Sequence, residues 1–481
     1  MAMSNRIKMM SKQEMDNIFE KCITIIAQKG FKVEHQQGLK ELDKAGAQVD
    51  FNSRMVKFPR ETVEWALKKV PQSFRLAHRS ERPDIILPSP TGTFYVRNGS
   101  GPPNYLDPES NTYRDMTVAY VKECGQLIEV LDGIDLCAYP SPQDVPKQTT
   151  DVHALKALLE STTKHITVQP YTVDSIKYLF ELGVAVAGSK EALKEKPIIS
   201  LFPCAFVPLG VMEHDMEAVL QSCLHGTPIQ IPSMPTTGAN SPATIAGTTL
   251  QSCTEFLYMI TIVQMLNPGN PVFCFPNIFT MDMRTGHPLQ STVESMLTSI
   301  SILQVLKDVF HVPVNLYGFG TDSPIPDGQS MIETSLRSML MFAAGSDILA
   351  GAGMVESYMG VSPVQMIIDN TLAGILRRIE SGVDVNEETL AYEEILQTVP
   401  MTGNYLERAH TVKHCRDAIL PELFIRCTAH TWRQDGSKDL YARTLERYRE
   451  LKKQLKPVSL SKEVQKELDG IVKQADKELA K

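Results

Sequence analysis

The chain has 481 residues, of which 43% are hydrophobic and 22% are charged, so it can bury a large core. No segment approaches the roughly 18 uninterrupted apolar residues that suggest a membrane span. The formal net charge is −8, with no local run of lysine and arginine, so neither nucleic acid nor a membrane is an expected partner.

Nine cysteines are spread along the chain with no pair at CxxC spacing, which indicates reduced thiols rather than a disulfide framework. Residues 1–15 carry basic residues but no apolar stretch of signal-peptide length. We therefore expect a cytoplasmic protein.

Residues 1–90 are predicted to form an N-terminal helical cap. Apolar residues recur at helical spacing in Gln13 to Lys29, and Thr62 to Lys69 predicts another helix between two prolines. Val49 to Phe51 and Met55 to Phe58 predict a short hairpin between these helices.

From about residue 93, short apolar or β-branched runs alternate with longer amphipathic stretches, a pattern typical of βα units. Eight strands are predicted, at Thr93 to Arg97, Ile134 to Tyr139, Ile166 to Gln169, Ile198 to Phe202, Ile229 to Pro232, Val272 to Phe275, Val314 to Gly318 and Ile348 to Gly351. The stretches between them are long enough for crossover helices, including Val118 to Leu131, Ser175 to Ala187, Glu213 to Leu224, Thr249 to Leu266, Thr292 to Phe310 and Gln329 to Ala343. Eight repeats favour an α/β fold in which residues 91–400 form a (β/α)₈ TIM-type barrel.

Residues 401–481 are expected to form a C-terminal helical extension packed on the barrel. The charged helical pattern of Pro457 to Lys481 is typical of a surface or subunit-contact element, which is compatible with a homo-oligomer.

The carboxyl ends of barrel strands are where chemistry is expected, and here they are rich in aromatic residues and poor in acid–base pairs. Aromatic faces suit an alkylammonium cation because the ring quadrupole attracts positive charge without a hydrogen bond. Ordinary core packing of the same rings is the alternative. The predicted substrate-binding residues at or near strand ends are Tyr95, Arg97, Tyr139, Phe275, Tyr317, Phe319 and Met354.

Two segments rich in Gly, Pro and small hydroxyl residues are predicted functional loops, Pro232 to Gly247 and Gly318 to Gln329. The candidates for a catalytic or charge-balancing role are Asp322, Asp327, Gln329 and Glu356, although no acid or base is required. The alternative for the first three is that they only cap the helix that follows.

Two motifs resemble known sites incompletely. Asp151-Val-His153-Ala-Leu-Lys156 matches the DxHxxG motif of corrinoid-binding domains except that Lys156 replaces glycine, so a helix start capped by Asp151 is expected and no tightly bound cofactor. His410 and His414 stand one helical turn apart, followed by Cys415, but the HExxH glutamate is missing, so no metal site is predicted.

The two predicted loops, together with Gly403 to His414 and Trp432 to Gly436, resemble the trimethylamine methyltransferase family. Gly30 to Val33, Ala45 to Val49 and Pro268 to Pro271 fit the same family, so the resemblance spans nearly the whole chain. The family's founding members carry pyrrolysine in the loop after the seventh strand, whereas Thr321 to Asp327 contains ordinary residues throughout. Which of these positions corresponds to pyrrolysine is open.

The resemblance implies methyl transfer from an amine to the Co(I) corrinoid of a separate, cognate corrinoid protein. Without pyrrolysine the implied substrate is a quaternary amine, because its leaving group departs as a neutral amine without acid catalysis. Glycine betaine is the first candidate, and proline betaine, carnitine and butyrobetaine remain open. Arg97 or His410 would meet a substrate carboxylate.

Two other functions remain open. One is a non-catalytic, betaine-binding or sensory barrel. The other is a metal-dependent barrel lyase or hydrolase that uses His410, His414 and Cys415.

Overall fold

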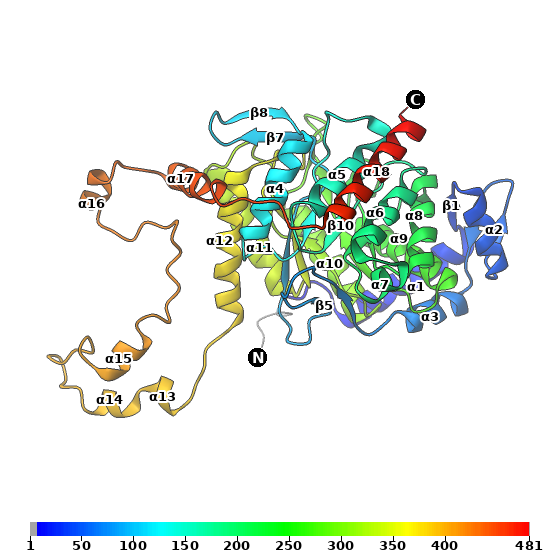
Figure 1. Ribbon diagram of the computed structural model, residues 1–481. Helices are drawn as coiled ribbons and strands as arrows, with labels where there is room; N and C mark the ends of the chain where they lie inside the picture. The colour runs from blue at the N-terminus through cyan, green and yellow to red at the C-terminus, as the bar shows by residue number, and fades with distance from the viewer. Residues whose placement is uncertain (1–6, 481) are drawn as a thin grey trace.

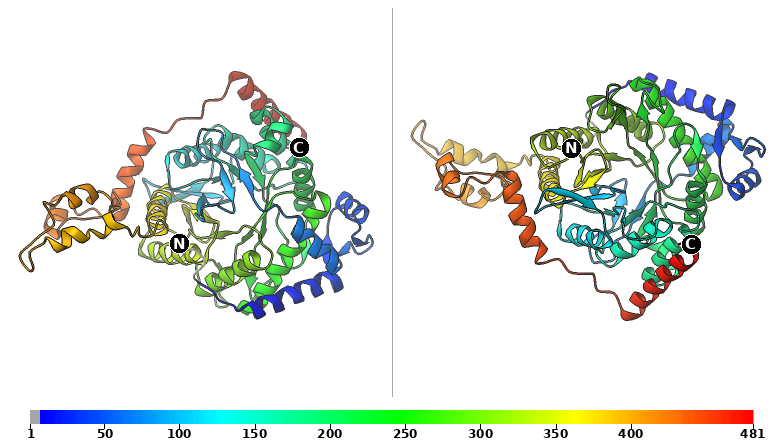
Figure 2. Two further views of the ribbon diagram at one scale, coloured as in Figure 1. Left: turned by 90° about the horizontal axis from the view of Figure 1, so that it is seen from below. Right: turned by 90° about the horizontal axis from the view of Figure 1, so that it is seen from above.

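The centre of the protein is a ring of parallel strands, described by a computed structural model that covers residues 7–480 (Figures 1 and 2). The strands are β6 (Tyr95–Asn98), β9 (Cys137–Ala138), β10 (Ile166–Val168), β11 (Ile199–Leu201), β13 (Ile229–Ser233), β15 (Val272–Pro276), β18 (Asn315–Tyr317) and β19 (Ile348–Ala352). They form two sheets, β9-β10-β11-β13-β15 and β18-β19-β6. Single parallel bridges, Arg97–Leu136 and Cys274–Val314, join the sheets at both edges.

The predicted α/β class and all eight predicted strands are confirmed, with strand ends displaced by at most three residues. The parallel ladder is not continuous, however. Pro276 and Pro313 lie at the edge between β15 and β18, where they have no N–H to extend the ladder, so a single bridge remains there.

The six predicted crossover helices are also confirmed, and they surround the strands in Figure 2. The helices of this layer are α4 (Val118–Val130), α5 (Thr150–Leu159), preceded by the short 3₁₀ helix η1 (Lys147–Thr149), α6 (Ile176–Ala187), α7 (Lys190–Glu195), α8 (Glu213–His225), α9 (Ile245–Leu266), α10 (Val293–Asp308), α11 (Gly328–Ala344) and α12 (Pro363–Glu380). The N-cap of α5 is Thr149, so the predicted cap at Asp151 is wrong. Asp151 lies inside the first turn, where its carboxylate accepts hydrogen bonds from Ser175 Oγ (2.6 Å) and Tyr171 N (3.0 Å).

The N-terminal segment packs outside α9 rather than over the strand ends. It contains α1 (Lys12–Gln28), β1 (Phe31–Val33), α2 (Gln36–Lys44), the predicted hairpin β2–β3 (Gln48–Asp50 and Met55–Lys57) and α3 (Arg60–Lys69). Phe31 stacks on Tyr258 of α9 with ring centroids 3.8 Å apart. Strand β1 pairs in parallel with β12 (Gly210–Val211), which ties the segment to the loop after β11. Because α1, α3 and α10 all contact α9, this helix is buried on most sides.

The two ends of the ring are covered differently. At the amino ends of the strands, the hairpin β4–β5 (Phe74–Leu76 and Ile85–Leu87) packs on Leu136, Phe273 and Ile348. At the carboxyl ends lie two small sheets made of β20-β21-β7-β8 and β14-β16-β17. Their bounds are β7 Asn104–Asp107, β8 Thr112–Asp115, β14 Thr236–Thr237, β16 Phe279–Met281, β17 Pro288–Leu289, β20 Met354–Val355 and β21 Gly360–Val361.

After α12 the chain leaves the body and returns, as Figure 1 shows at lower left. We call residues 383–438 the arm. It contains four short helices, α13 (Glu387–Leu390), α14 (Tyr392–Leu396), α15 (Ala409–His414) and α16 (Ala429–Gln434). Helix α17 (Leu440–Lys452) then packs against α12 and α4, and α18 (Lys462–Leu479) packs against α5 and α6. The predicted boundary at residue 400 falls within the arm.

No helix among residues 7–480 is long and apolar enough to cross a membrane.

Glu255 of α9 is a buried carboxyl group behind the end of β13. Its Oε2 accepts a hydrogen bond from Ser233 Oγ (2.7 Å), and its Oε1 accepts one from Gln251 Nε2 (3.2 Å). No cation lies among the groups that shift its pKa, and burial raises that pKa to about 7. The folded protein therefore holds a proton that the unfolded chain releases, so stability is lost as pH rises from the unfolded pKa of about 4.5 through the folded pKa.

Replacing this carboxyl group should remove part of that pH dependence. For Glu255→Gln we expect the fall in unfolding free energy between pH 5 and 8 to shrink by on the order of 3 kcal/mol, measured by urea denaturation. Glu467→Gln on the exposed side of α18 is the matched control and should leave the slope unchanged. Equal slopes for wild type and Glu255→Gln would contradict a protonated Glu255.

Candidate functional site

A cavity of about 390 Å³ lies at the carboxyl ends of the strands, where sequence analysis predicted a site. It is lined by Ser100, Gly101, Gln169, Tyr171, Phe202, Met234, Thr236, Asn277, Phe279, Pro288 and Tyr358. Pro288 is exposed and Thr236 is half-buried, so the cavity opens to solvent on this side. The lining is largely aromatic and apolar with a few amide and hydroxyl groups, as in many small-molecule sites.

Arg97 lies behind this cavity, fully buried. Its guanidinium carbon is 5.2 Å from the Phe275 ring centroid and 5.9 Å from that of Phe202, which lines the cavity. None of its three side-chain nitrogens has a hydrogen-bond partner within the described part of the chain. Burial lowers the Arg97 pKa. A buried, unpaired guanidinium is costly, because desolvation is not repaid by an anion.

Arg337 of α11 repeats this arrangement. It is fully buried, its guanidinium carbon is 5.0 Å from the centroid of the Tyr317 ring, and its side-chain nitrogens have no partner among residues 7–480. Burial lowers the Arg337 pKa to about 10, so the group remains a cation at neutral pH. Two buried cations therefore lie near Tyr317, the tyrosine that ends β18.

Buried hydroxyl groups surround Arg97. Tyr317 and Tyr358 stack with ring centroids 4.9 Å apart, and both lie close enough to Arg97 to influence its pKa. The hydroxyls of Ser100, Tyr139, Tyr317 and Tyr358 make no hydrogen bond of normal geometry within the described residues. Burial raises the pKa of each tyrosine, so all three stay protonated and can donate. We call Arg97, Ser100, Tyr139, Tyr317 and Tyr358 the interior cluster. It combines one guanidinium with hydroxyl groups that can donate to an anion.

Tyr358 is held in an unusual backbone conformation. Glu356, Ser357 and Tyr358 have φ values of 54°, 45° and 90°, a left-handed region that bulky residues rarely occupy. Backbone hydrogen bonds from Glu356 N to Ser323 O (2.8 Å) and from Ser357 N to Thr321 O (3.0 Å) hold the segment in place. Such strain is concentrated at functional sites, and here it places one ring both on the cavity and on the interior cluster.

Asp322, predicted as a catalytic or charge-balancing residue, connects three loops. Its Oδ1 accepts hydrogen bonds from Gln290 N (2.8 Å) and Ser357 Oγ (2.6 Å), and its Oδ2 accepts one from Ser291 N (2.8 Å). The Gln290 side chain in turn donates to Asn277 Oδ1 in the cavity wall (2.7 Å). Asp322 does not line the cavity itself. It holds the cavity wall in place through Gln290, which contacts Asn277, and through Ser357.

The other loop candidates have separate places. Asp327 is the N-cap of α11, accepting from Ser330 N at 2.9 Å, so the capping alternative is confirmed for it. Gln329 is exposed and pairs with Glu333 at 2.8 Å. Glu356 is half-buried beside Tyr113, whose pKa is raised first by burial and then by this carboxylate.

The structure brings some of the predicted substrate-binding residues together and separates others. Arg97, Tyr139, Phe275 and Tyr317 lie at or behind the cavity. Met354 is buried against Gly99, and Phe319 is buried in the core. Tyr95 packs with the hairpin β4–β5 at the opposite end, because it begins β6 instead of ending it. His410 lies in α15 of the exposed arm, where its Nε2 is 3.1 Å from Glu388 O.

Two residues of the site were missing from the prediction. Arg337 lies in the middle of a helix, where strand-end reasoning does not look, and its buried face also carries Thr334 and Ser338, so the sequence gives no clear signal that this arginine is buried. Tyr358 enters the site only through its left-handed backbone, which no local pattern indicates.

The His410–His414–Cys415 motif forms no metal-ligand cluster. His414 Nδ1 is 2.6 Å from Asp417 Oδ2 and its Nε2 is 3.3 Å from Glu388 Oε1. Within residues 7–480, no group of three His, Cys, Asp or Glu side chains is placed to hold a metal ion.

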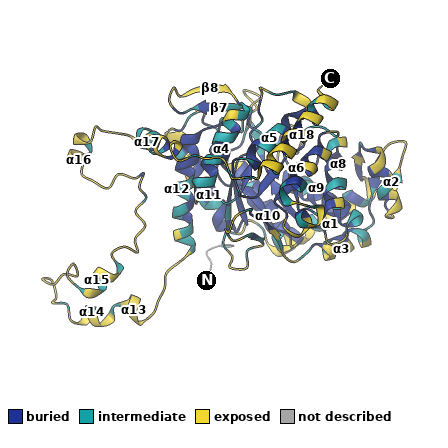
Figure 3. Cartoon of the chain, in the orientation of Figure 1, coloured by how far each residue is buried: buried dark blue, intermediate teal, exposed yellow. Residues whose placement is uncertain are grey.

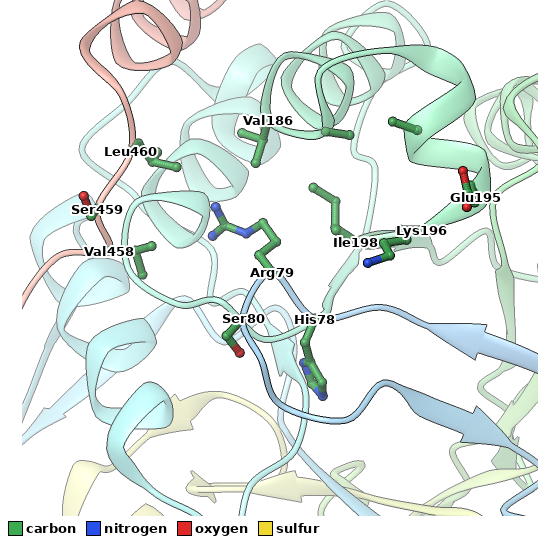
Figure 4. Close-up of a pocket in the computed structure, with 12 residues that line it drawn as sticks. His78, Arg79, Ser80, Val186, Glu195, Lys196, Ile198, Val458, Ser459 and Leu460 are labelled. Atoms are coloured by element: carbon green, nitrogen blue, oxygen red, sulfur yellow. The ribbon is translucent and has the colours of Figure 1, made fainter.

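A second cavity, of about 470 Å³, opens at the amino ends of the strands between α6, α7 and the segment before α18 (Figure 4). Figure 4 shows Arg79 reaching between Val186 and Val458. Its Nη2 donates to Leu159 O at 2.6 Å, at the carboxyl end of α5, and burial lowers the pKa of nearby His78 to about 4. This arginine already has partners, and residues at this end of a barrel usually serve stability.

Removing the Asp322 carboxylate should loosen the three loops. Asp322→Ala is expected to lower the free energy of unfolding by about 3 kcal/mol, since three hydrogen bonds to a charged acceptor are lost, as measured by urea denaturation. Gln329→Ala, in the same segment but exposed, should change it by less than about 0.5 kcal/mol. Asp322→Ala with wild-type stability would show that the loops do not depend on this carboxylate.

Comparisons with known proteins agree with the fold and with the sequence resemblance. The chain is 28% identical over 469 residues to trimethylamine methyltransferase MttB of Desulfitobacterium hafniense, covering 97% of this chain and 94% of that protein. It is 24% identical over 478 residues to a glycine betaine methyltransferase of the same species, covering 98% of each.

Among solved structures, the fold resembles that of the Methanosarcina barkeri monomethylamine methyltransferase (MtmB), with a TM-score of 0.52, 12% identity and 93% of each chain covered. At this identity the likeness concerns the fold alone. The family assignment comes from the sequence, in which residues 2–480 match the family described as trimethylamine methyltransferase (MTTB). The chain belongs to the trimethylamine methyltransferase family, and with it to the methyltransferases.

Proposed function

We propose that this chain transfers a methyl group from a quaternary ammonium carboxylate to the Co(I) corrinoid of a separate corrinoid protein. Glycine betaine is the first candidate substrate, with proline betaine, carnitine and butyrobetaine as the others. In this proposal the substrate lies at the carboxyl ends of the eight parallel strands.

The single observation that carries the proposal is Arg97, a buried guanidinium with no anionic partner directly behind the cavity. A carboxylate is the group that matches its planar set of donors. The free hydroxyls of Ser100, Tyr139 and Tyr358 complete the set of donors that a carboxylate would use. A methylammonium or quaternary ammonium cation without a carboxylate has no group that could accept from them.

The same geometry orients the substrate. The faces of Phe275 and Tyr317, predicted to hold the substrate cation, already face the guanidinium groups of Arg97 and Arg337. A second cation there would be repelled. The carboxylate therefore lies inward, and the ammonium lies among the outer rings of Tyr171, Phe279 and Tyr358, which line the open part of the cavity. This order turns the methyl groups toward solvent.

The family relationship supports the same substrate class. One relative of the chain is a glycine betaine methyltransferase, and the Thr321 to Asp327 loop contains no pyrrolysine. That loop contributes Asp322, which holds the cavity wall, rather than a group that would capture an amine. The non-catalytic alternative is distinguished by experiment, as binding without methyl transfer.

Methyl transfer from a quaternary nitrogen requires no general acid or base from the protein. The C–N bond breaks with its electron pair on nitrogen, so the leaving group is already a neutral amine. The corrinoid protein, as methyl acceptor, supplies the Co(I) nucleophile. The chain's own residues remove water from the cation and fix its orientation, which suits an aromatic cavity without an acid–base dyad.

The test is methylcorrinoid formation, followed by absorbance, with purified chain, a reduced corrinoid protein and a panel of amines. The panel contains the four betaines together with trimethylamine, choline and tetramethylammonium. We expect turnover with at least one betaine and much less with choline, which lacks a carboxylate. Tight betaine binding without methylcorrinoid would favour the sensory alternative, and preference for trimethylamine would overturn the proposal.

Arg97→Met gives a sharper prediction because function and stability should move in opposite directions. With the guanidinium gone, kcat/KM for the betaine should fall by about 100-fold to 1,000-fold, whereas the melting temperature of the free protein should not fall and is expected to rise. Arg97→Lys should restore only part of the activity, since a lysine is not a planar donor pair.

Arg79→Lys is the matched control, because it changes another largely buried arginine at the opposite end of the strands. It should leave kcat/KM unchanged. Full activity in Arg97→Met would show that the carboxylate binds elsewhere.

A further inference from the structure

The arm exposes apolar side chains to an unusual degree. Among the described residues, fifteen of the twenty-five large hydrophobic side chains that are exposed belong to residues 383–438. They are Val383, Val385, Leu390, Tyr392, Ile395, Leu396, Val399, Met401, Tyr405, Leu406, Val412, Ile419, Leu420, Phe424 and Ile425. Scattered exposed hydrophobic residues are normal, but a concentration of this size marks an interaction surface. Figure 3 shows the arm almost without buried segments.

The arm lacks a fold of its own that could hold it in place. Its helices have four to six residues, far below the length at which a helix is stable alone in water. Only Leu423 is buried, where Arg443 Nε of α17 donates to its carbonyl oxygen at 2.9 Å. The arm is therefore attached to the body near its second end, while the apolar side chains face outward.

A matching surface exists on the body of the same chain. Helix α11 exposes Gly328, Gln329, Ile332, Ser335 and Leu336, and none of these residues is charged. Ile332 is 69% exposed and Leu336 is 48% exposed, one helical turn apart. The outer face of a helix on a globular protein normally carries charged residues, so this face lacks what solvent exposure usually requires. Helix α11 packs beside α12, from which the arm leaves.

We propose that the arm lies on the α11 face of a second copy of this chain, and that the second arm does the same in return. One chain carries both an exposed apolar arm and an exposed apolar helix face, so a second copy offers each of them a partner surface. Reciprocal exchange of this kind closes into a dimer. Strongly apolar interfaces are typical of permanent assemblies.

The arm is turned away from the cavity mouth, which separates this surface from the one that a methyl acceptor needs. In Figure 1 the helices α13–α15 lie at lower left, whereas the hairpin β7–β8, which follows barrel strand β6, lies at the top. A partner that must reach the cavity in each catalytic cycle approaches from that upper side. A transient partner would also favour a smaller and more polar interface than the arm offers.

The test is the mass of the full-length chain in solution, measured by sedimentation at micromolar concentration. Wild type should have twice the mass of one chain. An arm variant, Leu396→Glu with Leu406→Glu, and an α11 variant, Ile332→Glu with Leu336→Glu, should each weaken dimerisation by about 100-fold or more. Leu224→Glu, an equally exposed leucine on α8, is the matched control and should remain dimeric.

Mixing the two variants distinguishes arm-to-α11 exchange from arm-to-arm contact. In the mixed pair, the intact arm of one copy meets the intact α11 face of the other, so a one-to-one dimer should form again. Each variant should still fold, with a far-UV circular dichroism spectrum like that of the wild type, since all the changed residues are exposed. A monomeric wild type, dimers that survive both sets of changes, or a mixture that stays monomeric would each overturn the proposal.

Discussion

The constraint on which the rest of the site depends is the burial of two guanidinium groups, neither of which is hydrogen-bonded to a carboxylate within residues 7–480. Aromatic faces under Arg97 and Arg337 return about 2 kcal/mol each in a desolvated setting, which is less than the cost of taking a cation out of water. The rest of the desolvation free energy is offset by the stability of the whole fold, whose parallel strands and closely packed helices keep the two side chains in place. An anion that enters the interior would recover this energy, so the barrel favours a substrate of one charge pattern before any contact with the substrate's cation is considered.

The loops above the strands keep this arrangement open to a ligand. Tyr358 belongs both to the cavity lining and to the interior cluster, and its backbone is held in a left-handed conformation by the loop that follows β18. Asp322 connects that loop to Ser357 and, through Gln290, to Asn277 in the cavity wall. The strained backbone at Tyr358 is thus held in place by hydrogen bonds from the loop that follows β18. The loop whose sequence departs from the pyrrolysine-containing members therefore acts here as a support for the binding cavity.

The sequence was sufficient to predict the positions of the strands. Each of the eight parallel strands is buried on both sides and appears as a short apolar run between amphipathic helices. The sequence also located Arg97, Tyr139, Phe275 and Tyr317, which lie at strand ends. The sequence was not sufficient to predict the location of a side chain where that location depends on contacts with residues far away in the chain. Tyr95 is two residues from Arg97 and yet lies at the opposite end, because the strand begins two residues later than predicted. His410 belongs to a helical pattern, but nothing in that pattern states that the segment leaves the body.

The same limit applies to charge. The sequence places aromatic residues at several strand ends. These residues predict a binding site for a substrate cation when no other cation is considered. The structure fills two of those ring faces with arginines, one of them from a helix outside the strand pattern. An aromatic ring binds only one cation at a given face, so the site of positive charge moves outward and a site for negative charge appears inside. The pairing of Arg337 with Tyr317 across elements, rather than the residue types themselves, is the reason why the proposed substrate is a zwitterion and not a simple cation.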